Sequence, residues 1–239
     1  MTEAGPRNGT FDQVLLGLAL VTSQLDGLEW LRKALRARDV RRAKAEGLAV
    51  TMEVTPQHLT LTDACCSGAD PTFKVNPPLR AAEDRDALRA GLADGTIDAV
   101  GTDHAPHAVE DKEVEFDQAP PGMIGLETAL AVNITWLVAA GVISLETLID
   151  KMACAPAKLF HLDGGTFRKG ALGDVTVFDP TAAWKVDASA FRTKGRNTPY
   201  QGRTLDAKLA SYNQDEDYAP TVRQVMRQIY PQARLAPAR

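Results

Sequence analysis

The feature that most constrains the fold of this chain is a short apolar run that ends directly in a polar, histidine-containing turn. The run is Ile97–Val100 and the turn is Gly101–Ala108, in which an aspartate and two histidines stand close together with a proline. Short apolar runs bounded by turn residues predict buried strands, and parallel α/β proteins gather their functional side chains where strands end. The pattern therefore predicts a site at the carboxyl end of a strand, although a polar loop that caps its own backbone has a similar composition.

The stretches before this turn alternate between helix and strand patterns. Apolar residues recur every three or four positions across 11–46, and Glu83–Ala93 has acidic residues in its first turn and Gly95 beyond its end, so both predict helices. Between them, Leu48–Val54 is rich in β-branched residues and stops before Pro56, which predicts a strand. The order helix, strand, helix, strand is typical of βα units, so the expected fold class is α/β with parallel pairing.

A long polar loop, Asp103–Gly122, follows the second strand, and loops of this length are usually functional lids or disordered. Beyond it, an apolar periodicity predicts a helix over Gly125–Ala140. Ser144 is placed to cap a further helix through Ala153, and Pro156 begins another short one. The residues of the first helix expected to face the core are Leu126, Leu130, Ile134 and Leu137.

Composition argues against several kinds of partner. Lys and Arg number 27 against 31 Asp and Glu, a net charge of −4, so neither nucleic acid nor an anionic membrane is expected. Cys65, Cys66 and Cys154 form no CxxC pair; they are expected to serve in packing and fit a reducing compartment. No secretory signal is expected, and Val14–Val21 is too short to span a bilayer. We therefore expect a cytoplasmic protein.

Five blocks of sequence share an order and spacing that point to one family. The blocks are Val54–Leu59, Lys74–Arg80, Thr102–His107, Pro121–Glu127 and Asn197–Gly202. Over roughly residues 40–205 they make the chain resemble the class I dihydroorotases, which are cyclic amidohydrolases of the metal-dependent amidohydrolase superfamily. The presence of Asn76 and His107 favours dihydroorotate over other cyclic amides within that superfamily.

The resemblance implies an activity and a set of site residues. Such enzymes interconvert N-carbamoyl-L-aspartate and L-dihydroorotate in pyrimidine synthesis, and zinc lowers the pKa of the attacking water. By position, Asp103 would bind the metal and carry the proton to the leaving nitrogen. Asn76 and His107 would hold the substrate, and the backbone at Pro121 and Gly122 would close over it, since glycine permits close approach.

The remaining histidines have plainer interpretations. His104 is expected to hydrogen-bond within its own turn rather than bind metal, and His58 is expected to be structural. His161 is expected at a loop or helix end. Two alternatives stay open for the site residues themselves: Asp103 as a turn cap and His107 as a surface histidine.

The chain also departs from the family pattern. The family's metal site uses an HxH pair after the first strand, a carboxylated lysine or aspartate after the fourth, and histidines from strands five and six. This sequence has four histidines and no HxH, and Trp30 aligns where the histidine of strand six should stand. One carboxylate cannot hold zinc, because a catalytic site uses about three protein ligands.

The expected fold is the C-terminal part of a (β/α)8 barrel, incomplete in this chain, with a small β-sandwich segment. A closed barrel takes about 250 residues, and only the last two barrel strands can be placed, over 50–54 and 97–102. The expected divisions are a helical segment of unclear origin (1–39), a partial amidohydrolase barrel (40–163), a β-rich segment (164–205) and a tail (206–239). A chain truncated or frame-shifted at both ends would have this pattern, and so would a degenerate paralogue.

Three hypotheses follow. The chain is a dihydroorotase part that is active only with a complementary N-terminal half, or a non-catalytic scaffold subunit for an enzyme such as aspartate transcarbamoylase, or a fragment that does not fold stably. A homo-oligomer is a further expected arrangement. The missing histidines favour the scaffold, whereas Asn76, Asp103 and His107 favour the enzyme, because a scaffold has no need of substrate-binding residues.

Overall fold

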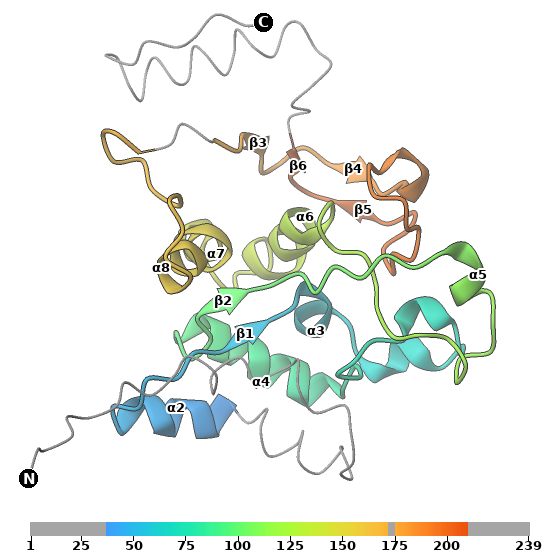
Figure 1. Ribbon diagram of the computed structural model, residues 1–239, viewed down its shortest axis with the longest axis horizontal. Helices are drawn as coiled ribbons and strands as arrows, with labels where there is room; N and C mark the ends of the chain where they lie inside the picture. The colour runs from blue at the N-terminus through green and yellow to red at the C-terminus, as the bar shows by residue number, and fades with distance from the viewer. Residues whose placement is uncertain (1–36, 172–174, 210–239) are drawn as a thin grey trace, which may run out of the picture.

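Residues 37–171 and 175–209 are described by the computed structural model (Figure 1). Most of the helix predicted over 11–46 lies outside the described residues, and its last part is α2 (Ala37–Ala45). Trp30 and residues 1–36 of the predicted helical segment (1–39) also lie outside the described residues. Within the two described ranges, none of the helices is long and apolar enough to cross a membrane.

A two-stranded parallel sheet lies at the centre of the molecule (Figure 1). It consists of β1 (Glu53–Val54) and β2 (Ala99–Val100), with Glu53 opposite Ala99 and Val54 opposite Val100. The strand order and parallel pairing agree with the prediction, but both strands are shorter than predicted. The predicted strand over 48–52 does not form, and Leu48 is 56% exposed. β-branched composition favours a strand only where a partner strand packs alongside.

Short helices surround this sheet and connect its strands. β1 leads directly into α3 (Pro56–Thr60), for which Thr55 is the N-cap. The other helices in chain order are α4 (Ala82–Ala93), α5 (Val109–Lys112), α6 (Ala129–Asn133), α7 (Leu145–Ile149) and α8 (Ala155–Leu159). Short 3-10 turns lie at η3 (Asp63–Cys66), η4 (Pro71–Phe73) and η7 (Ala188–Ala190), and π-helical turns continue α6 and α7 as η5 (Ile134–Val138) and η6 (Asp150–Cys154).

Most of the local helix predictions are confirmed. α4 matches its predicted range to within one residue, and the Ser144 hydroxyl caps α7 by accepting from the Thr147 N–H at 3.1 Å. One core prediction is wrong, because Leu126 is 61% exposed. The helix begins at Ala129 rather than Gly125, so Leu126 lies ahead of the buried helical stripe.

Two apolar clusters form the core. The first surrounds the parallel sheet and the second lies between α6 and the β-rich part of the chain. The buried members of the first are Val54, Leu59, Leu92, Ile97, Val100, Ile134, Leu137, Ile143, Leu148 and Ala207. Those of the second are Leu61, Val75, Leu79, Met123, Ala131, Val132, Val186, Tyr200 and Leu205.

The β-rich part contains two antiparallel pairs that lie beside α6 (Figure 1). β3 (Phe178–Asp179) pairs with β6 (Lys208–Leu209), and β4 (Trp184–Lys185) pairs with β5 (Thr204–Leu205). The predicted boundary at 205 is too early, because β6 belongs to the residues expected in the tail. The Tyr200 hydroxyl lies 2.9 Å from the Thr60 hydroxyl, and this hydrogen bond joins the β-rich part to α3.

Candidate functional site

Asp103 lies at the carboxyl end of β2, where the chain turns sharply. Its φ of +47° falls in the left-handed region, which few residues other than glycine adopt and which aspartate tolerates better than most. The residue is exposed. The backbone therefore presents this carboxylate to solvent at the end of the parallel sheet, as the sequence predicts for a functional side chain.

A second carboxylate lies on the neighbouring strand. Glu53 of β1 extends across Gly101, where an added Cβ would be 3.1 Å from Glu53 Oε2. Although Glu53 reaches solvent, the surrounding protein removes enough water to raise the pKa of its carboxyl, and the negative charge of Asp103 raises it further. Sequence analysis missed Glu53, although an acidic residue inside an otherwise apolar strand pattern is an available signal.

Both ring nitrogens of His58 are occupied by protein atoms. Nε2 lies 2.9 Å from the Pro77 carbonyl, to which it must donate, and Nδ1 lies 2.5 Å from Thr55 Oγ1. Burial lowers the pKa of His58, against smaller opposing effects of the Pro77 carbonyl and Asp103. The neutral ring therefore ties α3 to the loop at Pro77, in agreement with the structural role predicted for it.

His104 holds distant segments together, not its own turn as predicted. The backbone N–H groups of Gly125 and Leu126 donate to its Nδ1 at 3.1 and 3.3 Å, so this nitrogen carries no proton. Its Nε2 lies 3.4 Å from the Thr193 hydroxyl. The ring is thus occupied on both sides and anchors the segment that leads into α6.

The structure brings His107, Pro121 and Gly122 together. The Nε2 of His107 donates to the Pro121 carbonyl at 3.1 Å. Gly122 has φ +136°, and a Cβ there would lie 2.8 Å from His107 Nε2 and 2.7 Å from Ala105 Cβ. Contacts shorter than 3 Å leave no room for a side chain, so this approach requires glycine.

Asn197 joins these two loops and was missed as a site residue. Its Nδ2 donates to the carbonyls of Ala105 at 2.9 Å and Gly122 at 3.1 Å, and its Oδ1 accepts from the His107 N–H at 3.1 Å. The residue is buried. Asn197 opens one of the five sequence blocks, so the motif contained the signal although its contacts did not follow from it. We call Ala105, His107, Pro121, Gly122 and Asn197 the Asn197 cluster.

Asn76 lies on a neighbouring segment. It is exposed and precedes Pro77 through a cis peptide bond. The carbonyl of Lys74, two positions earlier, accepts from the Gly122 N–H at 2.9 Å. This hydrogen bond ties the segment that bears Asn76 to the Asn197 cluster. His161, by contrast, follows the end of α8 with φ +53°, at the helix end predicted for it.

The described residues do not complete a metal site. No group of three or more His, Cys, Asp and Glu side chains in 37–171 and 175–209 is arranged to hold a metal ion. His58 and His104 already use both ring nitrogens within the protein. Asp103 alone therefore falls short of the roughly three protein ligands of a catalytic zinc.

Comparison with known proteins identifies the class of protein. The sequence profile of the amidohydrolase family matches residues 20–207, so the chain belongs to the amidohydrolase family. Members of this family are generally metal-dependent and have a TIM-barrel fold, of which the matched residues form a part.

Within that family, the chain is similar to dihydroorotases. It is 52% identical over 168 residues to the dihydroorotase of Pelotomaculum thermopropionicum, covering 70% of this chain and 39% of that protein. It is 45% identical over 202 residues to the dihydroorotase of Syntrophus aciditrophicus, covering 83% and 47%. The chain thus spans less than half the length of these relatives. They confirm the resemblance drawn from the five sequence blocks.

The fold has a relative of known structure in another cyclic amidohydrolase. The L-hydantoinase (dihydropyrimidinase) from Arthrobacter aurescens superimposes with a TM-score of 0.69 and 36% sequence identity. The superposition covers 72% of this chain and 40% of that one. The arrangement of the described elements is therefore that of part of a cyclic amidohydrolase.

Proposed function

We propose that this chain carries the substrate-binding side of a dihydroorotase, which interconverts N-carbamoyl-L-aspartate and L-dihydroorotate. The observation that carries the proposal is the Asn197 cluster, which holds Pro121 and Gly122 against His107, a residue of the turn that also contains Asp103. Relatives about half identical to the chain are dihydroorotases, which supports the same reaction.

The residues have distinct roles in this proposal. His107 and Asn76 hold the substrate, with His107 near its carboxylate; the Nε2 of His107 donates to the Pro121 carbonyl, which leaves Nδ1 for the substrate. The backbone at Pro121 and Gly122 closes over the ring. Asp103 serves as metal ligand and as the group that carries a proton to the leaving nitrogen.

Zinc is the metal of this proposal. Among the described residues, we assign only Asp103 as a ligand to it. Residues outside 37–171 and 175–209, in the same protein or in a complementary N-terminal half, would supply the others. The β-rich part would then correspond to the composite sandwich of the family, and the protein would act in the cytoplasm. A homo-oligomer is compatible with the same proposal.

The test measures reversible cyclisation of N-carbamoyl-L-aspartate with zinc, by the chain alone and mixed with the N-terminal half of a related dihydroorotase. We expect turnover and bound zinc in the mixture. Asp103→Asn should abolish turnover, whereas the matched substitution Asp163→Asn, at an exposed position after α8, should not. Absence of both turnover and dihydroorotate binding in every mixture would contradict the proposal.

A second candidate is a non-catalytic scaffold subunit. The incomplete set of metal ligands among the described residues favours it, and the Asn197 cluster does not. Size-exclusion chromatography with aspartate transcarbamoylase distinguishes the two. Co-elution of a chain that binds no dihydroorotate supports the scaffold, and separate elution counts against it.

A further inference from the structure

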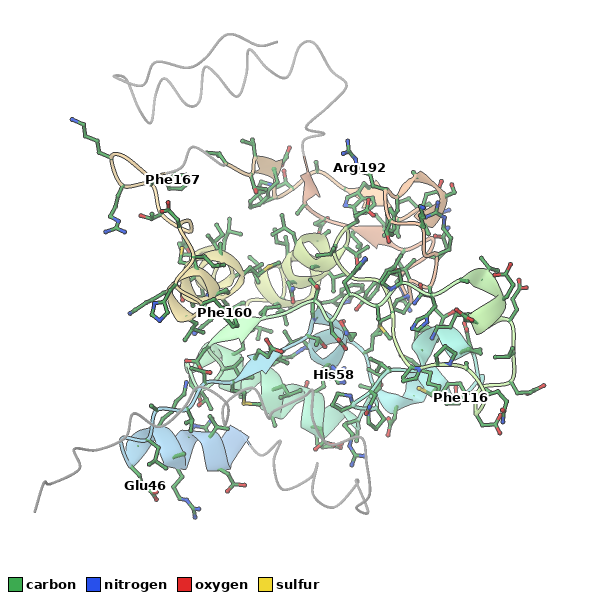
Figure 2. All side chains as sticks on the ribbon, in the orientation of Figure 1. Glu46, His58, Phe116, Phe160, Phe167 and Arg192 are labelled. Atoms are coloured by element: carbon green, nitrogen blue, oxygen red, sulfur yellow. The ribbon has the colours of Figure 1, made fainter. Side chains whose placement is uncertain are left out.

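Two lysines connect the segment 109–122 to the segment that bears Asn76. The first segment begins with α5 and ends at Gly122, and the second runs from η4 at Pro71 to Asn76. Figure 2 shows Phe116 in the segment that follows α5, away from His58 at the centre of the molecule. The segment 109–122 corresponds to most of the long loop that the sequence predicts to be a lid or disordered.

Lys112, at the end of α5, makes the central contacts. Its ammonium group donates to the Pro120 carbonyl at 2.7 Å and to the Pro71 carbonyl at 3.2 Å. The side chain is half-buried; this burial and the nearby charge of Lys74 lower the pKa of Lys112. A half-buried ammonium group with two backbone carbonyl acceptors fixes the backbone that carries those carbonyls.

Lys74 contacts the same segment at other positions. Its ammonium group donates to the Asp117 carbonyl at 2.9 Å and lies 5.6 Å from the centroid of the Phe116 ring. Its own backbone carbonyl accepts from the Gly122 N–H at 2.9 Å. Cationic donors and a backbone bond therefore hold the segment 109–122 at both of its ends.

We propose that Lys112 is a positioning residue that sets the distance between Gly122 and Asn76, the two sides between which the substrate binds. Pro120 directly precedes Pro121, so the 2.7 Å bond from Lys112 fixes the backbone that closes over the ring. The bond to Pro71 fixes the start of the segment that ends at Asn76. The inference rests on the proposed function, because the substrate is dihydroorotate only if that function holds.

The test compares Lys112→Met, which keeps the length of the side chain without its donors, with Lys112→Arg, which keeps charge and donors. Lys158→Met, at an exposed lysine of α8, is the matched control. We expect Lys112→Met to speed hydrogen exchange at residues 113–122 about tenfold or more, since a charged hydrogen bond contributes at least that factor. The affinity of the chain for L-dihydroorotate, measured by calorimetry, should fall by a similar factor, and Lys112→Arg should restore most of both.

The outcomes separate the inference from the function it rests on. Faster exchange and weaker binding at an unchanged thermal unfolding midpoint support positioning by Lys112. Unchanged exchange and affinity in a folded Lys112→Met variant overturn it. If the Lys112→Met variant does not fold, Lys112→Gln, which is shorter and uncharged, takes its place. Exchange at 113–122 equal to that of the parent in a folded Lys112→Gln variant overturns the inference. If the parent chain neither binds nor turns over dihydroorotate, alone or mixed with the N-terminal half, the proposed function fails, while the exchange data still decide whether Lys112 holds the segment.

Discussion

Asp103 and His107 belong to one turn, but their surroundings differ. Around His107, the Asn197 cluster holds two loops together through hydrogen bonds of 2.9–3.1 Å and a glycine contact that excludes any side chain. Around Asp103, the neighbouring titratable groups are Glu53, which shares its charge, and His58, whose ring is already bonded. Within the described residues, the side proposed to bind substrate is therefore joined by hydrogen bonds, whereas no group of side chains is arranged to hold a metal ion.

Substrate contacts and a metal site therefore have separate physical requirements. Substrate contacts depend on backbone geometry, which local loops can fix through a few buried hydrogen bonds. A metal site depends on several side chains that converge from many strands of a barrel. A chain with two parallel barrel strands can satisfy the first requirement without the second.

The largest effect is expected from Gly122→Ala. The added Cβ would lie 2.7 Å from Ala105 Cβ at a φ of +136°, and overpacking with backbone strain costs roughly 3 kcal/mol of unfolding free energy. Chemical denaturation measures the loss. Gly141→Ala is the matched control, because it has φ +70° with no described atom within 4 Å of its Cβ position. Strain alone should cost about 1 kcal/mol there, so equal losses would contradict a tight contact at Gly122.

Asn197→Ala should follow. It removes the partner of the Ala105 and Gly122 carbonyls and of the His107 N–H, of which the Gly122 bond is buried and the other two are half-buried, at a cost of about 2 kcal/mol. Asn197→Asp keeps the acceptor for His107 but loses both donors, so its stability and its affinity for dihydroorotate should differ from those of the alanine variant. If Asn197→Ala were as stable as the parent, other contacts would have to hold the two loops together.

On the Asp103 side, the expected effect is a dependence of stability on pH through His58. Burial lowers the pKa of His58 in the folded state below the ordinary value of 6.5, so the unfolded chain binds more protons than the folded one in that range. The stabilising contribution is complete above pH 6.5 and is lost as the pH falls through the lowered pKa. Unfolding free energies between about pH 7.5 and 5 measure this slope. His58→Gln should make it shallower, and an unchanged slope would assign the dependence to other groups.

The smallest effect is expected from Glu53→Gln. The folded state raises the pKa of this carboxyl above 4.5, so its contribution to stability is present at lower pH and is lost as the pH rises through the raised pKa. At neutral pH the ionised group is therefore a penalty that glutamine removes. The gain should be less than about 1 kcal/mol and should vanish below pH 4.5. Denaturation at both pH values measures it, with the exposed Glu115→Gln as control; a loss of stability at neutral pH would contradict the raised pKa.

Much of the fold was predictable where the signal was local. The acidic first turn of α4, the Ser144 cap and the parallel order of the two strands follow from neighbouring residues. Leu126 was misplaced because helical spacing alone does not show where a helix begins. The helix begins only at Ala129, because the N–H groups of Gly125 and Leu126 donate to the His104 ring instead.

Motif resemblance predicts residues for the candidate site, but the contacts among them do not follow from it. Motif resemblance selected Asp103, His107 and Gly122, whereas Asn197, Lys112 and Glu53 were missed or given no role. Asn197 acts on atoms 75 to 92 positions away in the chain. A residue whose role is to join distant segments has no characteristic local pattern.

By itself, the sequence determined the family of this protein, its short helices and the residues placed at the end of β2. Only the tertiary structure decided which histidines already use their ring nitrogens within the protein. His58 and His104 are bonded to atoms 19 to 89 positions away, which removes them as ligands. The physical reason is that helix caps and apolar periodicity depend on adjacent residues, whereas the pairing of a buried donor with its acceptor depends on which distant segments pack together.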